Sequence, residues 1–235
     1  MKRRQFIAAA GGTLFLVPLA EGGERETNIV YNAEDVLDEI TAIPARSIPV
    51  SLLRRAQGIA IFPGVVKAGF VVGVRHGHGI IVARDDNGAW SNPVFLTITG
   101  GSLGWQAGAQ STDIVLVFMN MRGVREILRG RQFALGVDAA IAAGPIGRQA
   151  EADTDARLQA EIYSYSRSRG LFVGVSLGGS QIKVDRGANA YYYNTFDATP
   201  EDIVAGVNIQ VPRSAAELKE MITRYASEAP RRRRD

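Results

Sequence analysis

The sequence predicts an α+β fold: a strongly bent antiparallel β-sheet or barrel-like β-structure with flanking N-terminal and C-terminal helices. Short β-rich segments, separated by glycine or turn residues, fill the middle of the chain from Ile59 to Tyr193. Apolar residues at helical spacing precede and follow them. Glycine accounts for 26 of 235 residues, about 11% against a usual 7% or so. This excess allows the backbone bends and close approaches that a tightly curved sheet needs.

The first 20 residues resemble a twin-arginine signal peptide for export. Lys2, Arg3 and Arg4 precede an apolar run that ends at Ala20 and is too short to span a bilayer comfortably. Paired arginines at this position are typical of signals that export folded proteins. Pro18 fits poorly at a cleavage site after Ala20, so a cleaved signal and an uncleaved anchor both stay open.

A polar linker over residues 21–32 is expected to lead into one domain over residues 33–226, because the chain is long enough for one domain with a sizeable core and short for two. Val36, Leu37 and Ile40 have helical spacing, with acidic residues near the start of the helix, where its dipole favours them. Ser51 is a plausible N-cap for a second short helix, over residues 52–56.

The central segments predict an antiparallel sheet. The expected strands are 59–62, 68–74, 79–84, 94–99, 102–109, 114–119, 133–143, 161–166, 171–177, 181–184 and 190–193. The sequence Asn87-Gly88 predicts a hairpin turn, because Asn-Gly readily supplies positive φ angles. A helix over 123–128 should stop at Gly130. A strand at 190–193 would place Tyr191 and Tyr193 on one face and Tyr192 on the other.

An amphipathic helix over residues 215–226 should close the domain, followed by a basic, disordered tail over 227–235. Residues 1–20 hold three of the 27 bases and none of the 24 acids, so the remaining chain carries 24 of each. A general nucleic-acid binder should be more basic, and no nucleic-acid partner is predicted. The lack of cysteine excludes disulfides, thiolate metal sites and a cysteine nucleophile.

No catalytic residue, metal or cofactor is predicted. Ser102 and Ser176 each lie in a G-x-S-x-G sequence, but β-rich segments continue where a hydrolase needs a helix, and the only histidines precede both serines. His76 and His78 could share a strand face and bind a metal, yet a third ligand is not evident nearby. A glycine-rich hairpin tip is the preferred interpretation of these histidines.

Several ordered motifs carry a resemblance to a known family. They are Gly58-Ile-Ala-Ile-Phe-Pro-Gly-Val-Val-Lys-Ala-Gly-Phe, the segment from Gly100 to Asp113, Gly144-Pro-Ile-Gly-Arg, and the segment from Glu161 to Leu177. In order and content they resemble the SYLF domain family over about residues 33–195. The resemblance implies a non-enzymatic lipid-binding module, of which eukaryotic members bind phosphoinositides and accompany actin machinery. It implies here an exported bacterial member.

The first helix of this chain is acidic where eukaryotic members carry basic residues, at Glu34, Asp35, Asp38 and Glu39. Phosphatidylglycerol, cardiolipin or another anionic envelope lipid is therefore the expected ligand. Periplasmic localisation is expected, with inner-membrane anchoring if the signal is not cleaved. The expected lipid-binding residues are Leu37, Ile40, Leu52 and Leu53 for apolar contact, and Arg54, Arg55 and Lys67 for the headgroup.

Two alternatives remain at this point. Core packing is the competing explanation for the four apolar positions. The alternative function is a structural or protein-interaction module of the envelope, in which Trp90, Trp105 or the tyrosines at 191–193 contact a protein partner.

Overall fold

The computed structural model describes residues 23–42, 48–145, 160–168, 171–174 and 177–227. It describes the backbone alone at Ala42, 69–72, 102–109, Ser168 and 171–174. The expected signal peptide, the tail beyond Ser227 and Ser176 lie outside the described residues, as does the side chain of Ser102.

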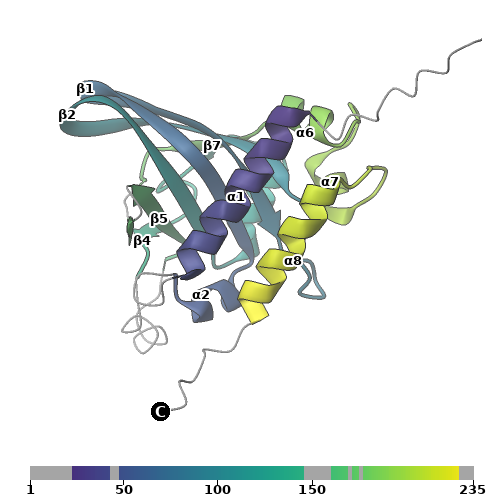
Figure 1. Ribbon diagram of the computed structural model, residues 1–235. Coiled ribbons are helices and arrows are strands. Elements are labelled where there is room, and N and C mark those ends of the chain that lie inside the picture. The colour runs from purple at the N-terminus through teal and green to yellow at the C-terminus, as the bar shows by residue number, and fades with distance from the viewer. Residues whose placement is uncertain (1–22, 43–47, 146–159, 169–170, 175–176, 228–235) are drawn as a thin grey trace, which may run out of the picture.

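Two long strands, β1 (Gly58–Ala83) and β2 (Val94–Phe118), form one antiparallel ribbon through the centre of the sheet (Figure 1). The six separate strands expected here are continuous. A register shift between Phe62 and Val65 lies where a break was expected, and another between Gly69 and Val71 lies within an expected strand; both bend the ribbon without ending it.

The turn that joins these strands confirms the Asn-Gly prediction. Gly88 has a φ of 82°, and its N–H donates to the Asp85 carbonyl at 3.0 Å. The Asp85 carboxylate accepts the N–H groups of Asn87 and Ala89 at 2.9 and 2.8 Å. The aspartate therefore fixes the turn from within, as Asx turns do.

β1 folds back on itself, so that its first limb (residues 58–69) lies against its second limb (residues 71–83). A Cβ atom on Gly77 would lie 2.7 Å from a Val65 methyl, and one on Gly79 would lie 2.8 Å from the Phe62 Cα. Only glycine permits such an approach of one backbone to another. The fold-back gives the sheet its curled shape (Figure 1).

Within the described parts of the chain, five short strands extend this ribbon into a seven-stranded sheet. They are β3 (Phe133–Ala134), β4 (Ile141–Ala143), β5 (Ile162–Ser168), β6 (Leu171–Gly174) and β7 (Gln181–Val184). One half of β2 pairs with β5 and the other half with β7, which places the two ends of β2 on different parts of the curl. The α+β prediction with a strongly bent sheet is confirmed, although β4 pairs with β5 in parallel.

The strand expected over 133–143 is two strands with a turn between them. Gly136 has a φ of 81°, and the Asp138 carboxylate accepts the N–H of Ala134 at 2.6 Å. A positive-φ glycine followed by a turn-forming aspartate ends β3 after two residues.

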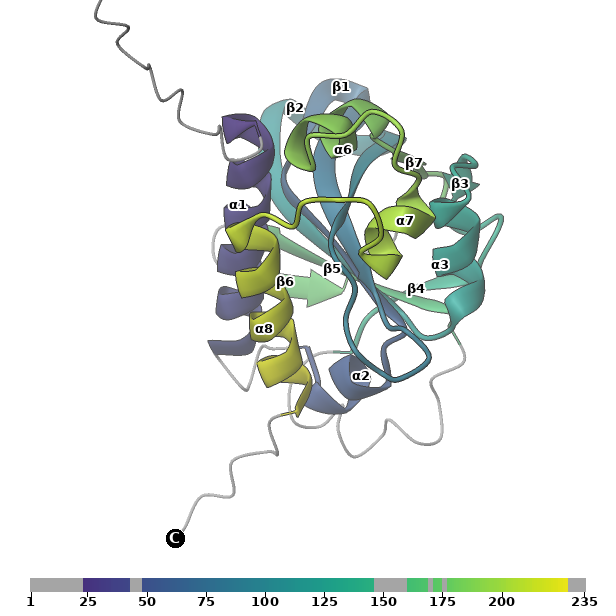
Figure 2. The same ribbon diagram turned by 90° about the vertical axis from the view of Figure 1, so that its right-hand side faces the viewer.

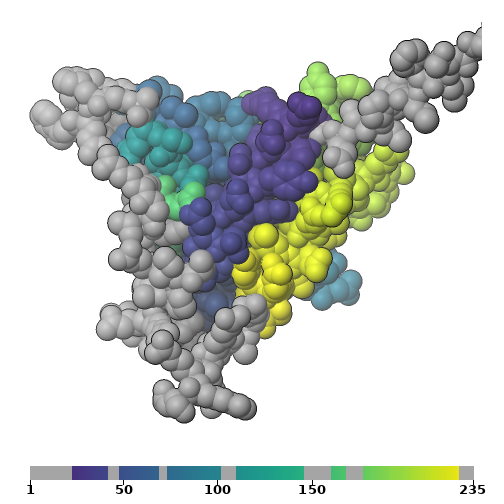
Figure 3. Space-filling model, viewed as in Figure 1, coloured from purple at the N-terminus to yellow at the C-terminus, as the bar shows by residue number. Residues whose placement is uncertain are grey.

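Helices pack against the curled sheet on more than one side (Figure 2). They are α1 (Glu24–Ala42), α2 (Val50–Arg55), α3 (Met121–Leu128), α6 (Arg186–Tyr192), α7 (Pro200–Ala205) and α8 (Arg213–Ser227). α1 and α8 lie side by side across one face, as Figures 1 and 3 show. α3 follows Asn120, whose side chain accepts the Arg122 N–H, and Gly130 follows its end with a φ of 72°.

Three predictions about helices were wrong. α2 begins at Val50 after Pro49, so Ser51 lies within this helix and does not cap it. α1 begins at Glu24, so residues 24–32 are not a linker; fully buried Val30 extends the apolar stripe one turn before Ala33. The strand expected over 190–193 is mostly the end of α6, which starts because the Asp185 carboxylate accepts the Ala188 N–H. Tyr192 and Tyr193 are consequently both buried, and Tyr191 is 65% exposed.

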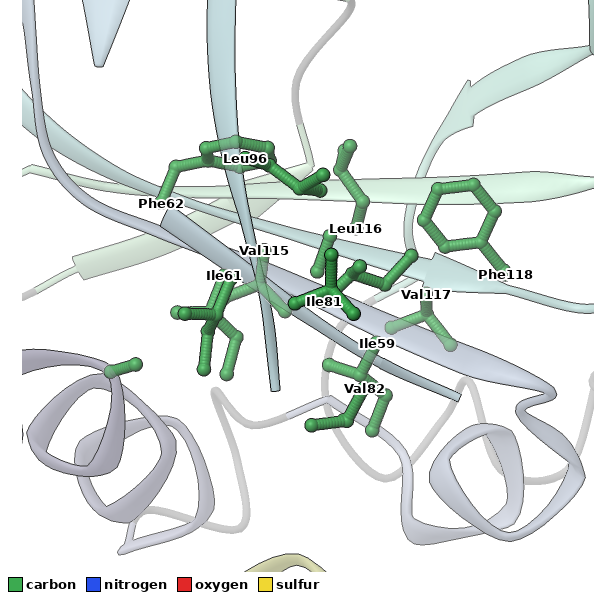
Figure 4. Packing of buried hydrophobic residues seen from close by; sticks show 14 of the residues in the cluster. Ile59, Ile61, Phe62, Ile81, Val82, Leu96, Val115, Leu116, Val117 and Phe118 are labelled. Atoms are coloured by element: carbon green, nitrogen blue, oxygen red, sulfur yellow. The ribbon is translucent and has the colours of Figure 1, made fainter. Parts of the chain in front are cut away.

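The core lies inside the curl and under the helices (Figure 4). Ile59, Ile61 and Phe62 of the first β1 limb meet Ile81 and Val82 of the second limb there. Both limbs of β1 therefore contribute side chains to one apolar core.

Candidate functional site

Arginine side chains gather at the end of the molecule where α2 lies. Arg54 and Arg55 are exposed in the last turn of α2. The Arg84 guanidinium reaches them from the end of the second β1 limb, donating from Nε to the Ala56 carbonyl at 2.8 Å and from a terminal nitrogen to the Arg54 carbonyl at 3.3 Å. It also lies 4.4 Å from the Trp90 ring centroid, and desolvation lowers the pKa of Arg84.

α8 adds to this group. Arg54 donates to the Ser227 carbonyl at 3.5 Å, and Arg224 is exposed in the last turn of α8. We call the set Arg54, Arg55, Arg84 and Arg224 the basic end. In the sequence the chain continues from Ser227 to four further arginines, 231–234.

The structure buries the apolar residues that were predicted to bind lipid and leaves Arg54 and Arg55 exposed. Leu37, Ile40, Leu52 and Leu53 are each at most 2% exposed. They pack beneath α1 and α2 in the core, so the prediction that they contact a bilayer is wrong for this folded state, and core packing accounts for all four. These apolar stripes face inward because the curled sheet offers them an apolar surface to bury.

Lys67 does not join the basic end. It lies on the first β1 limb opposite Gln110, nine residues beyond Gly58, or about 30 Å of extended chain. Of the predicted headgroup residues, the structure therefore brings together Arg54 and Arg55 only.

A groove lies where α1 passes the fold-back of β1. Its volume is about 530 Å³. It is lined by Arg25, Ile29 and Asn32 of α1, Pro63, Gly64, Val66 and Ala68 of the first β1 limb, and Val74, His76, Gly77 and His78 of the second limb. We call this the α1–β1 groove. Sequence reasoning did not identify it, because only the fold-back brings the two limbs together.

A chain of hydrogen bonds fixes the cationic side of this groove. Arg25 lies 2.8 Å from Nε2 of His78, and Nδ1 of His78 lies 3.3 Å from an Asp185 carboxylate oxygen. A guanidinium can only donate, so Nε2 accepts and the proton of a neutral imidazole lies on Nδ1, facing Asp185. The arrangement holds the Arg25 charge at the edge of the groove.

The interpretation of His76 and His78 as a hairpin tip was wrong, because both lie within β1, paired with Thr99 and Thr97 of β2. The two rings make an edge-on contact with centroids 5.1 Å apart. Both nitrogens of His78 already have partners in Arg25 and Asp185. Within the described ranges, no group of three or more His, Cys, Asp or Glu residues is arranged to hold a metal ion.

The carboxyl group of Glu34 lies between α1 and α8. Burial, together with Glu217 of α8 and Asp35 of α1, raises the pKa of Glu34 from 4.5 to about 7. Among the described residues, Glu34 Oε1 is buried and has no hydrogen-bond partner. A proton on this carboxyl group therefore favours the packing of α1 against α8.

We predict that Glu34→Gln changes how stability depends on pH. Because the folded-state pKa is raised, the wild type should lose stability as pH rises from about 4.5 to 7, and the penalty should be complete above 7. The Glu34 side chain is half-buried, so we expect a loss of only about 1 to 2 kcal/mol. Denaturant unfolding at pH 5 and pH 8 should show Glu34→Gln more stable than wild type at pH 8 only. The exposed α8 variant Glu220→Gln should keep the wild-type difference, and equal pH dependence in all three proteins would contradict the assignment.

The aromatic residues expected to contact a protein partner are differently placed. Trp90 is 4% exposed and lies under Arg84. Tyr191 is the exposed member of the tyrosine run, and Phe196, a few residues later, is 83% exposed. The side chain of Trp105 lies outside the described part of the structure.

Comparison of the amino-acid sequence with known proteins relates the chain to one family. A family model described as "Ysc84: Las17-binding protein actin regulator" matches residues 99–225, more than half of the chain. An SH3 domain-containing YSC84-like protein 1 of Xenopus laevis is 36% identical over 198 residues, covering 82% of this chain and 58% of the relative. Protein YSC84 of Saccharomyces cerevisiae is 38% identical over 173 residues, covering 73% of this chain and 36% of the relative.

An SH3 domain-containing protein of Schizosaccharomyces pombe is 41% identical over 171 residues, covering 72% of this chain and 39% of the relative. The chain thus spans less than two thirds of the length of each of these proteins. No helix among the described residues combines the length and apolar character needed to cross a membrane.

Proposed function

Because the chain belongs to the Ysc84/SYLF family, we propose that it is a non-enzymatic binding module that associates reversibly with anionic phospholipid. The basic end is the observation that carries this proposal. Arg54 and Arg55 of α2, Arg84 just after β1 and Arg224 near the end of α8 lie at one end of the fold, where Arg54, Arg55 and Arg224 are exposed. Each base held near an anionic membrane contributes about 1 kcal/mol, so a cluster gives useful affinity.

Electrostatic association at the basic end suits a reversible surface contact. The core keeps its apolar residues, so binding requires no unfolding, and salt should weaken it. The twin-arginine-like signal at residues 1–20 supports a location in the bacterial envelope, in the periplasm or at the inner membrane. Phosphatidylglycerol and cardiolipin are the anionic lipids proposed as ligands.

The test is flotation of the full chain with vesicles of neutral phosphatidylcholine, or of the same lipid with phosphatidylglycerol or cardiolipin, at low and high salt. We expect flotation with anionic vesicles above the neutral-vesicle level, and its loss at high salt. Arg54→Glu with Arg55→Glu should lower partitioning about tenfold or more, because two attractions become repulsions.

A matched control changes net charge equally elsewhere. Lys183 on β7 and Arg186 at the start of α6 are both exposed, and reversing both to glutamate should leave anionic flotation near the wild-type level. Lys67→Glu should have a small effect, because Lys67 lies away from the basic end. If the Arg54/Arg55 pair floated as well as wild type, the basic end would not be the lipid site.

The second candidate function is a protein-interaction module of the envelope. Exposed Tyr191 and Phe196 favour it, because aromatic side chains are enriched at protein interfaces. The matching family is described as Las17-binding, which makes a protein partner for this chain a reasonable alternative. Absence of flotation with every vesicle and salt concentration would support this function over lipid binding.

A further inference from the structure

We propose that the α1–β1 groove binds one single-chain anionic amphiphile, with the acyl chain along the two β1 limbs and the anionic head beside Arg25. The site is separate from the basic end and goes beyond surface association, because it would take a lipid monomer. Fatty acids and monoacyl phospholipids share the required chemistry.

The walls of the groove are apolar. Val66 and Val74, from opposite limbs of β1, are 48% and 66% exposed although both are large apolar residues. Ile29 of α1 and Pro63 also belong to the lining. Its volume of about 530 Å³ lies within the range of small-molecule sites, about 300 to 1,000 Å³. An acyl chain would remove the valine side chains from water.

The charge of the groove selects an anion. Arg25 lies at its edge, His76 is exposed beside it, and the described lining residues include no carboxylate. Asp185 accepts a hydrogen bond from Nδ1 of His78 and does not belong to the lining. A carboxylate or phosphate near Arg25 would gain a charge-assisted hydrogen bond. These features favour an anionic amphiphile over an uncharged one.

The shape of the groove depends on the glycines of the second limb. Gly77 belongs to the lining, and a Cβ atom there would lie 3.2 Å from the Val65 Cα. The limbs approach closely at Gly77 and Gly79 and carry outward-facing apolar residues beyond that point. The same fold-back that curls the sheet therefore also makes the groove.

The test is displacement of fluorescent cis-parinaric acid from the full chain. We expect saturable binding and displacement by palmitate, by lysophosphatidylglycerol, or by both, which distinguishes a free carboxylate from a phosphate head. Val74→Glu should weaken binding about tenfold or more, because it places a carboxylate in the acyl path. Val137→Glu is the matched control, since Val137 is 79% exposed outside the groove, and it should bind like wild type.

The head contact has its own test. Arg25→Gln should weaken palmitate binding about fivefold and leave displacement by uncharged hexadecanol unchanged, whereas Arg122→Gln on the exposed side of α3 should change neither. Failure of both anionic amphiphiles to displace the probe would overturn the proposal, as would equal losses in Val74→Glu and Val137→Glu. A change of oligomeric state in Val74→Glu by sedimentation, without loss of probe binding, would instead identify the groove as an interface between copies of this chain.

Discussion

Replacing Gly79 with alanine is expected to lower the free energy of unfolding by about 3 kcal/mol or more. The added Cβ would collide with the Ile61 carbonyl oxygen and lie 2.8 Å from the Phe62 Cα. Both are backbone atoms of the opposite limb of β1, and they cannot move aside as the end of a side chain can. The limbs would have to separate, which would open the core beneath them.

Chemical denaturation of Gly79→Ala should show the loss as a lower midpoint, or as an unfolded chain by circular dichroism. Gly101→Ala is the control, because Gly101 lies in the same ribbon, opposite Val74, and a Cβ atom there meets no described atom within 4 Å. That variant should be as stable as wild type or slightly more stable. Similar midpoints for the two alanine variants would mean that the limbs of β1 do not approach as closely as described.

Replacing Asn189 with alanine should cost about 2 to 3 kcal/mol of stability. The buried Asn189 side chain accepts the Phe95 N–H at 2.9 Å and donates to the Phe95 carbonyl at 3.2 Å. It thereby pairs with β2 as a neighbouring strand would, just beyond the Leu96–Val184 pair of β7. Alanine would leave the buried Phe95 N–H without its acceptor, and such a group is expensive to bury.

Thermal or denaturant unfolding measures this cost. Asn28→Ala, on the exposed side of α1, should change stability by less than about 0.5 kcal/mol. Asn189→Asp should not restore the wild-type value, because a carboxylate keeps the acceptor but loses the donor that faces the Phe95 carbonyl. A wild-type midpoint for Asn189→Ala would show that α6 does not depend on this contact.

Local chemistry explains which elements could be predicted from the sequence. The turn at Asn87-Gly88, the stop at Gly130 and the strand 181–184 each follow from neighbouring residues, and each was found where expected. The tyrosines at 191–193 favour a strand by propensity, yet the Asp185 cap and the burial of Tyr192 and Tyr193 make them part of a helix end. Tertiary packing determined that outcome, and propensity alone could not show it.

The candidate site was only partly predictable for the same reason. Arg54 and Arg55 are neighbours in the chain, so their proximity was certain, whereas Arg84 and Arg224 join them only through the fold. Leu37, Ile40, Leu52 and Leu53 have the spacing of a membrane-facing stripe and equally that of a core-facing stripe. Spacing cannot distinguish a bilayer from the interior of the protein. The α1–β1 groove depends on a fold-back for which no local signal exists.

The long β1–β2 ribbon also has a consequence for the order of events in folding. The turn at Asn87-Gly88 brings Ile81 and Val94 together across a short loop, while Gly58 and Phe118 are its most distant pair. Pairing that proceeds outward from the turn closes only a small additional loop at each step, so the entropic cost of the distant contacts is met gradually. A topology with many long-range contacts can in this way form without a single improbable encounter.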